Sequence, residues 1–326
     1  MDIRGKHLVL TGGASLIGSY IAEQLLAEGV GQITVADNFS LGSSQQLDHL
    51  AGDSRLQVVN CDVLRLDQLL KVMQGAEGVF HVAGYLTLPL SRDLYKGVDV
   101  NVRGTHNVLE ASHFCGVKKV VLSSSVAVYG NPDGTIGESA PFNRTSVGYS
   151  PAAAIYGATK IINEHMAQIY SATYGLEHVA LRYASVYGAR QHGRAVNALL
   201  LTEPLEQIRE GRRPVIHGDG SEVHDYVHVK DVANANVVAM KSAVGSGSFT
   251  IGTGVSTSCR EVVDILLDLF DSSLEPEYSS AKRANSSAVS SSFDFDVSAA
   301  REVLGWTAKI GMREGLQDLK RWYESK

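Results

Sequence analysis

The 326-residue chain has few cysteines, few prolines and no excess of positive charge, and these shortages exclude several classes of protein. Its three cysteines, Cys61, Cys115 and Cys259, are widely spaced, so we expect neither a disulfide framework nor a thiolate metal site. A net charge of −6 gives no electrostatic footprint for nucleic acid. No apolar run approaches the roughly 18–20 residues that span a bilayer, and no signal-peptide pattern opens the chain. We therefore expect a cytoplasmic protein with no nucleic-acid or membrane partner.

Glycine, in contrast, is abundant, with 32 residues in 326. Flexible linkers usually enrich glycine and proline together, but proline stands at only 7, so the glycines indicate structure. At roughly 150 residues per domain, the length predicts about two domains with a large buried core.

Strand and helix signals alternate through the first half of the chain. Short apolar or β-branched runs predict strands at 7–11, 32–37, 56–61, 78–83, 119–123 and 177–182. Helical patterns lie between them at 16–28, 66–74, 100–115 and 156–174. This alternation predicts an α/β fold with a parallel sheet covered on both faces. Ligands of such sheets bind at the carboxyl ends of the strands.

A glycine turn follows the first strand, where residues 11–18 read Thr-Gly-Gly-Ala-Ser-Leu-Ile-Gly. Such a turn lets a pyrophosphate approach the N–H groups of the next helix, although Ser15 stands where a middle glycine is usual. Asp37 ends the second strand 19 positions after Gly18, where a carboxylate binds the adenosine ribose and repels a 2′-phosphate. These residues favour NAD over NADP. Asp62 and Val63, after the third strand, either meet the adenine ring or form a turn.

A tyrosine and a lysine stand one helical turn apart at Tyr156 and Lys160, on the same helix face. A free tyrosine has a pKa of about 10, but a nearby ammonium and an oxidised nicotinamide both favour the phenolate. Three serines, Ser123 to Ser125, follow the fifth strand. With the nucleotide turn, these residues predict a catalytic unit.

Together these segments resemble the extended short-chain dehydrogenase/reductase family, in its NAD-dependent epimerase/dehydratase branch, over nearly the whole chain. The likeness also rests on residues 81–84 (His-Val-Ala-Gly), 101–105 (Asn-Val-Arg-Gly-Thr), 181–183 with 186–188, 218–220, 225–229 and 304–306 (Leu-Gly-Trp). It implies a Rossmann-type doubly wound sheet with a smaller C-terminal substrate-binding domain. The NAD domain would hold residues 1–183 and about 226–256, and the substrate domain about 184–225 and 257–326.

The resemblance implies a role for each matching residue. Ser125 would be the catalytic hydroxyl, Tyr156 the acid/base, and Lys160 the group that tunes Tyr156 and holds the nicotinamide ribose. The helices predicted at 100–115 and 156–174 would form a homodimer interface. The implied NAD site consists of Gly12, Ser15, Leu16, Ile17, Gly18, Asp37, Asn38, Asp62, Val63, Ala83, Gly84, Asn101, Ser123, Tyr156 and Lys160.

Four positions depart from the family pattern on the substrate side. Ser185 replaces a usual asparagine, His224 replaces an arginine that clamps the diphosphate, and Leu86 replaces the lysine of galactose epimerases. Arg283 is the candidate for the arginine of the family's tail motif. The implied substrate-binding residues are therefore Ser125, Ser185, His224 and Arg283.

The resemblance implies that Tyr156 removes a sugar hydroxyl proton as a hydride passes to NAD⁺. We favour a nucleotide-sugar 4-epimerase acting on a UDP-hexose or UDP-N-acetylhexosamine, in which the hydride returns to a keto intermediate. Alternatives are net dehydrogenation of a non-nucleotide sugar or other hydroxylated small molecule, a sugar dehydratase, or a cofactor-sensing protein without catalysis. His217, His224 and His228 fall in strand and loop, so we expect no metal there.

Overall fold

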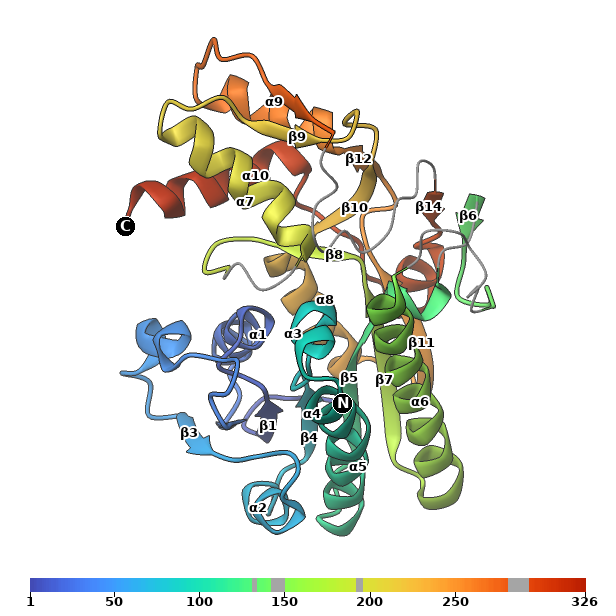
Figure 1. The fold of residues 1–326 in the computed structure, drawn as a ribbon. Helices are drawn as coiled ribbons and strands as arrows, with labels where there is room; N and C mark the ends of the chain where they lie inside the picture. Colours follow the sequence, from blue (N-terminus) through green and yellow to red (C-terminus); the bar gives the residue numbers. More distant parts are fainter. Residues whose placement is uncertain (131–133, 142–149, 192–195, 281–292) are drawn as a thin grey trace.

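A seven-stranded parallel sheet forms the centre of the protein (Figure 1). The computed structural model describes residues 1–130, 134–141, 150–191, 196–280 and 293–326. Neighbouring strands follow the order β11-β7-β5-β4-β1-β2-β3, and every pair is parallel. The strands are β1 (His7–Thr11), β2 (Gln32–Asp37), β3 (Leu56–Asn60), β4 (Gly78–His81), β5 (Lys119–Ser125), β7 (Glu177–Tyr183) and β11 (Ser246–Ile251). The predicted doubly wound α/β fold is confirmed.

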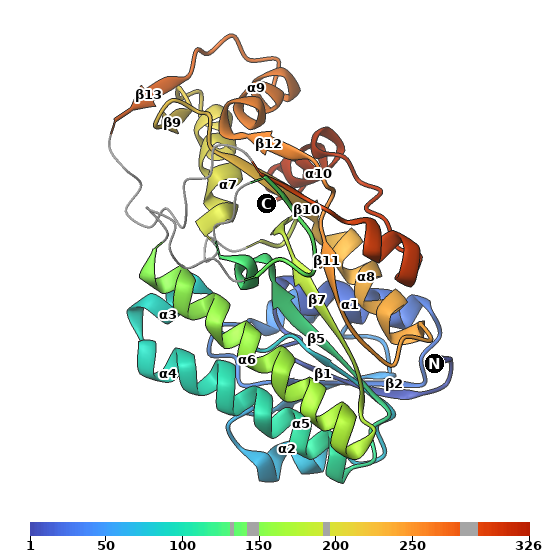
Figure 2. The same cartoon turned by 90° about the vertical axis from the view of Figure 1, so that its right-hand side faces the viewer.

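Helices bury both faces of this sheet, as Figure 2 shows. Side chains that alternate along a strand enter opposite cores: Leu8 and Leu10 pack on one face and Val9 on the other. One face is covered by α1 (Leu16–Ala27) and α8 (Val229–Lys241). The other face is covered by α2 (Leu66–Val72), α5 (Thr105–Phe114) and α6 (Pro151–Tyr174).

Several element boundaries differ from the sequence prediction. Strand β11 was not predicted, because its first three residues, Ser-Gly-Ser, hide the apolar end of the strand. Helix α6 begins at Pro151 instead of residue 156, since the Ser150 hydroxyl accepts a hydrogen bond from the Ala153 N–H (3.1 Å) and caps an earlier turn. The predicted helix 100–115 opens as a π-helical turn, η2 (Asp99–Gly104), before α5.

A second layer of structure stands beyond the carboxyl ends of the strands, at the top of Figure 1. Its core is formed by side chains of α7 (Val196–Arg209), α9 (Cys259–Leu269) and α10 (Met312–Glu324). Helix α9 is amphipathic, with Val262, Val263 and Leu266 on its buried face. Three small sheets join this layer: β8 (Ser185–Tyr187) with β10 (Val223–His228) and β12 (Ser256–Ser258), β9 (Val215–His217) with β13 (Glu277–Ser279), and β6 (Gly134–Ile136) with β14 (Phe293–Phe295).

Short helices complete the chain: η1 (Ser44–Leu50), α3 (Thr87–Arg92), α4 (Leu94–Val98), η3 (Val126–Tyr129) and η4 (Ala300–Leu304). Within the described ranges, none of the helices combines the length and the apolar character needed to cross a membrane. All three cysteines are free thiols.

A buried ion pair fastens α6 to the sheet. Arg182 on β7 and Glu164 on α6 approach to 2.6 Å (Nη2 to Oε2), and the hydroxyls of Ser124 and Ser248 donate to the same carboxylate. Burial alone would raise the pKa of Glu164, but the Arg182 guanidinium and these hydrogen bonds hold it below its ordinary value. The pair therefore stabilises the fold above the ordinary pKa of Glu164, and this contribution is lost as the pH falls through the depressed value.

We expect Arg182→Met to lower the free energy of unfolding by about 3–5 kcal/mol, because it leaves a buried carboxylate without its partner. Urea unfolding at pH 7 measures the change. Arg103→Met, which removes an exposed ion pair to Asp99, is the matched control and should stay near the wild-type value. Equal stability of the two variants would contradict this account.

Candidate active site

A cavity of about 440 Å³ opens at the carboxyl ends of the central strands. It brings together most of the residues that the sequence predicted for the cofactor, the chemistry and the substrate. The predicted residues in its lining are Gly12, Ser15, Leu16, Ile17, Asp37, Asn38, Val63, Ala83, Gly84, Ser125, Tyr156, Ser185 and His224.

The glycine turn between β1 and α1 is shaped for close backbone approach. Gly12 has a φ of +70°, and a Cβ there would lie 2.5 Å from the Ala83 nitrogen. A Cβ on Gly18 would lie 2.5 Å from the Gly13 Cα. The turn thus presents the N-terminal N–H groups of α1 to the cavity, as a dinucleotide pyrophosphate requires.

Ser15, the departure from the expected glycine pattern, is the N-cap of α1. Its hydroxyl accepts from the Gly18 N–H (3.2 Å) and donates to the Gly12 carbonyl (2.7 Å). The side chain therefore fixes the turn without obstructing it.

Asp37 supplies a carboxylate at the end of β2. It accepts hydrogen bonds from the N–H groups of Ala14 (3.0 Å) and Phe39 (2.8 Å), which joins the end of β2 to the glycine turn. Burial raises the pKa of Asp37, and the two amide hydrogen bonds oppose that shift. Asn38 donates to the Asp62 carboxylate (3.1 Å), so Asp62 braces the residue after Asp37 while the neighbouring Val63 lines the cavity. This arrangement fits NAD.

Tyr156, Ser125 and Lys160 meet at the carboxyl end of β5. Ser125 is the last residue of β5 and Tyr156 lies on α6, and both line the cavity. The buried Lys160 ammonium lies 5.6 Å from the centre of the Tyr156 ring and donates to the Ser123 carbonyl (2.8 Å). Burial lowers the pKa of Lys160 to about 8, so at pH 7 it remains mostly protonated beside the tyrosine.

Two predicted residues, Asn101 and Ser123, do not line the cavity but contact residues that do. Asn101 accepts from the Tyr85 N–H (2.7 Å) and donates to the Tyr85 carbonyl (3.0 Å), which fixes the loop that follows Gly84. The Ser123 hydroxyl lies 3.1 Å from the Tyr183 hydroxyl. Asn101 therefore positions the backbone of Tyr85, and Ser123 contacts the side chain of Tyr183, two residues that line the cavity.

His81 stabilises the strand ends behind the cavity, a role that its place in the 81–84 motif did not predict. Its two ring nitrogens lie 2.7 Å from the Thr11 hydroxyl and 2.9 Å from the Thr105 hydroxyl, which links β1, β4 and α5. Burial lowers the pKa of His81 to about 3, so the ring is neutral. Its buried position in β4, between two hydroxyl-bearing elements, is visible only in three dimensions.

Of the residues predicted to bind the substrate, two more line the cavity and one lies outside the described residues. Ser185 and His224 line the cavity, and His224 Nε2 lies 2.8 Å from a Glu222 carboxylate oxygen. His228 is fully buried, packs against Tyr187 (ring centroids 5.3 Å apart) and does not line the cavity. Arg283 lies outside the described residues.

Among the residues that are described, no three histidine, cysteine, aspartate or glutamate side chains gather as a metal site would need.

A parallel sheet with a glycine turn, a carboxylate after β2, and a serine, tyrosine and lysine around one cavity defines an enzyme of the extended short-chain dehydrogenase/reductase type. The profile of the NAD dependent epimerase/dehydratase family matches residues 8–252. The chain belongs to this family and is an NAD-dependent enzyme of the epimerase/dehydratase type.

Full-length relatives and solved structures agree with this assignment. The UDP-glucose 4-epimerase of Mycolicibacterium smegmatis is 33% identical over 324 residues, covering 98% of each chain. The UDP-glucose 4-epimerase of Thermotoga maritima, solved with UDP-glucose, superposes with a TM-score of 0.85 at 28% identity, over 98% of this chain and 99% of that one. The Thermus thermophilus UDP-glucose 4-epimerase, solved with NAD, gives 0.80 at 28% identity, with the same coverage.

We expect Asp37→Ser to weaken NAD binding by roughly tenfold, or about 1.4 kcal/mol, and to reduce the preference for NAD over NADP, because the carboxylate that we assign to the ribose is lost. Calorimetric titration with both dinucleotides measures the two affinities. Asp219→Ser, in an exposed turn of the second layer, should behave as wild type. An unchanged NAD/NADP ratio in Asp37→Ser would remove Asp37 from the ribose site.

Proposed function

We propose that this enzyme interconverts the C4 epimers of a UDP-hexose or a UDP-N-acetylhexosamine. The observation that carries the proposal is that Tyr156 and Ser125 share one cavity with the glycine turn and Asp37. A reacting sugar carbon can thus lie beside both the acid/base group and the nicotinamide end of the cofactor. NAD, when bound, supplies the hydride acceptor and donor.

The chain's own residues manage the proton. We assign Tyr156 to take the proton of the sugar C4 hydroxyl and to return it, and Ser125 to hold that hydroxyl by a hydrogen bond. The Lys160 charge favours the phenolate form of Tyr156. Leu86, Leu88 and Phe295 give the same cavity apolar walls that keep water from the reacting carbon.

We assign the substrate to the second layer, with Ser185, His224 and Arg283 as its contacts. The NAD domain would comprise residues 1–183 and about 226–256, and the substrate domain about 184–225 and 257–326. The separate core of α7, α9 and α10 supports this division. Relatives support the substrate class, because the Thermotoga maritima enzyme is solved with UDP-glucose and a Methanobrevibacter ruminantium relative, 26% identical with a TM-score of 0.84, is a UDP-N-acetylglucosamine 4-epimerase.

The His224–Glu222 pair favours a second candidate, net oxidation of a non-nucleotide sugar. An imidazole held by a carboxylate is a weaker diphosphate ligand than a free guanidinium, which binds phosphate with two parallel hydrogen bonds. Steady accumulation of NADH with free sugars and added NAD⁺ distinguishes this reaction from epimerisation, which regenerates its cofactor.

We expect the purified enzyme to interconvert UDP-glucose with UDP-galactose, or the corresponding N-acetylhexosamines, without net NADH production. Tyr156→Phe should lower the turnover number by about 10²–10⁴, the usual contribution of a positioned acid/base. Chromatography of the nucleotide sugars measures conversion, and Tyr278→Phe, on an exposed strand, is the control. No conversion of any of these four sugars would overturn the proposal.

We also propose that the enzyme is a homodimer that pairs through the α4–α6 side of the molecule. Large apolar side chains are exposed on this side, including Tyr95, which is 88% exposed. The others are Leu94, Phe114, Ile162, Ile169 and Tyr174. Exposed apolar side chains on neighbouring helices support an interface there.

We expect Ile162→Glu combined with Ile169→Glu to convert the dimer to a monomer, because the substitutions place two carboxylates on the paired helices. Light scattering coupled to gel filtration measures the mass. Val303→Glu, equally exposed but on η4, should leave the mass unchanged. A wild-type monomer at micromolar concentration would contradict the proposal.

A further inference from the structure

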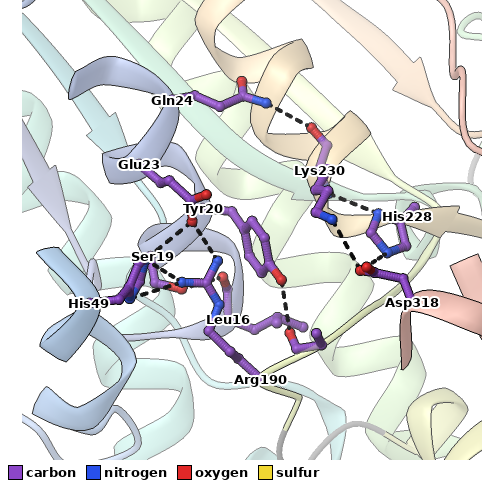
Figure 3. A network of polar contacts seen from close by, with 11 residues as sticks. Leu16, Ser19, Tyr20, Glu23, Gln24, His49, Arg190, His228, Lys230 and Asp318 are labelled. Carbon is purple, nitrogen blue, oxygen red and sulfur yellow. Dashed lines mark hydrogen bonds and ion pairs between the residues drawn. The ribbon is translucent and has the colours of Figure 1, made fainter. Parts of the chain in front are cut away.

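The loop that follows β8 holds an arginine in an unusual backbone conformation. Arg190 has a φ of +68°, in the left-handed region that residues with a side chain rarely adopt. Such a conformation persists only where the surroundings hold it in place, and it often marks a functional segment. Figure 3 shows the contacts that hold this residue.

Arg190 binds two elements of the cofactor side at once. Its guanidinium stacks 3.6 Å from the centre of the Tyr20 ring and lies 2.8 Å from the Glu23 carboxylate, both on α1. It also lies 2.6 Å from His49 Nε2 on η1. The side chain is only 17% exposed, so these contacts replace much of its hydration.

The backbone of the same loop is held as well. The Gln46 side chain on η1 donates to the Arg190 carbonyl (2.9 Å), and the Tyr20 hydroxyl donates to the Ala189 carbonyl (3.4 Å). The next residue, Gln191, lines the cavity and accepts from the Gly188 N–H (3.1 Å). The Arg190 contacts thus fix the position of a cavity-lining residue.

Both elements gripped by Arg190 continue into the dinucleotide site. Helix α1 begins at the glycine turn, and η1 follows the segment 40–42, which lines the cavity beside Asp37. The Ser43 N–H donates to the Ala14 carbonyl (2.9 Å), which ties the start of η1 to the turn itself. Arg190 therefore connects, from outside the cavity, three parts of the wall that surrounds the cofactor.

A second set of contacts on α1 lacks this connection. Gln24 donates to the Lys230 carbonyl on α8 (3.1 Å), and the Lys230 ammonium lies 3.2 Å from Asp318 on α10 (Figure 3). Lys230 and Asp318 are not in the cavity lining, and neither bonds to η1 or to the described part of the Arg190 loop, residues 188–191. This pair provides a matched comparison from the same network.

We propose that Arg190 is a positioning residue that holds the wall of the NAD site closed and slows release of the cofactor. An enzyme that regenerates its cofactor in every turnover gains from retaining it. The inference depends on the NAD site and not on the identity of the sugar, so it stands or falls independently of the proposed substrate.

For the test, the enzyme is first loaded with NADH. Fluorescence then measures the rate of NADH release after mixing with excess NAD⁺, with no sugar present. We expect Arg190→Ala to release NADH at least tenfold faster, and Arg190→Lys, which keeps the charge but loses the planar stacking on Tyr20, to lie between it and wild type. Glu23→Gln removes the charge partner from an exposed position and should accelerate release about threefold. Lys230→Met should stay within twofold of wild type.

Salt provides a readout that loss of structure alone does not give. The Arg190–Glu23 pair is partly exposed, so we expect release from wild type to accelerate between 0.05 and 0.5 M NaCl, and release from Glu23→Gln to change much less. Circular dichroism at each salt concentration confirms that the variants are folded. Release rates of Arg190→Ala or Glu23→Gln within experimental error of wild type, or equal acceleration in Lys230→Met, would overturn the inference.

Discussion

The close approach of Gly12 to the backbone of Ala83 is the constraint on which the rest of the structure depends. With no side chain between them, the ends of β1 and β4 meet, and α1 begins directly over the sheet. That start directs the N–H groups of α1 into the cavity and lets Asp37 accept from Ala14. His81 at the end of β4 stabilises the same contact between the strand ends, because its ring nitrogens bond to the hydroxyls of Thr11 on β1 and Thr105 on α5. The cofactor site is thus primarily a property of the backbone.

One face of α6 connects the cavity to the ion pair that fastens this helix to the sheet. Tyr156, Lys160 and Glu164 follow one another at intervals of four residues, so they lie along a single stripe of the helix. The first faces the cavity, the second donates to the Ser123 carbonyl, and the third pairs with Arg182. The Glu164 charge opposes the effect of burial on the pKa of Lys160. A structural ion pair and the lysine beside Tyr156 are therefore coupled through one helix.

Patterns among neighbouring residues predicted the strands and turns that neighbouring residues determine. Apolar runs located six of the seven central strands, and glycine spacing with Asp37 located residues that do line one cavity. The polar start of β11 carries a weak strand signal, and it was missed. The Pro-Ala-Ala-Ala start of α6 favours a helix but shows no amphipathic pattern, and the start of this helix was misplaced. Ser15 looked like a defect in the turn, because its capping bonds exist only once the turn is folded. The contacts of Arg190 join positions more than 140 residues apart, and no local pattern reports them.

The two halves of the cavity are specified by different means, which explains why one was easier to predict. The dinucleotide half uses glycine geometry and amide hydrogen bonds, and few sequences satisfy these requirements. The half that we assign to the substrate is lined by individual side chains such as Ser185 and His224, which can change while the fold persists. Because His224 is already bonded to Glu222, a substrate phosphate must either share that imidazole or displace the carboxylate. If His224 binds the substrate as proposed, Glu222 acts on that substrate through the imidazole, although only His224 drew attention in the sequence.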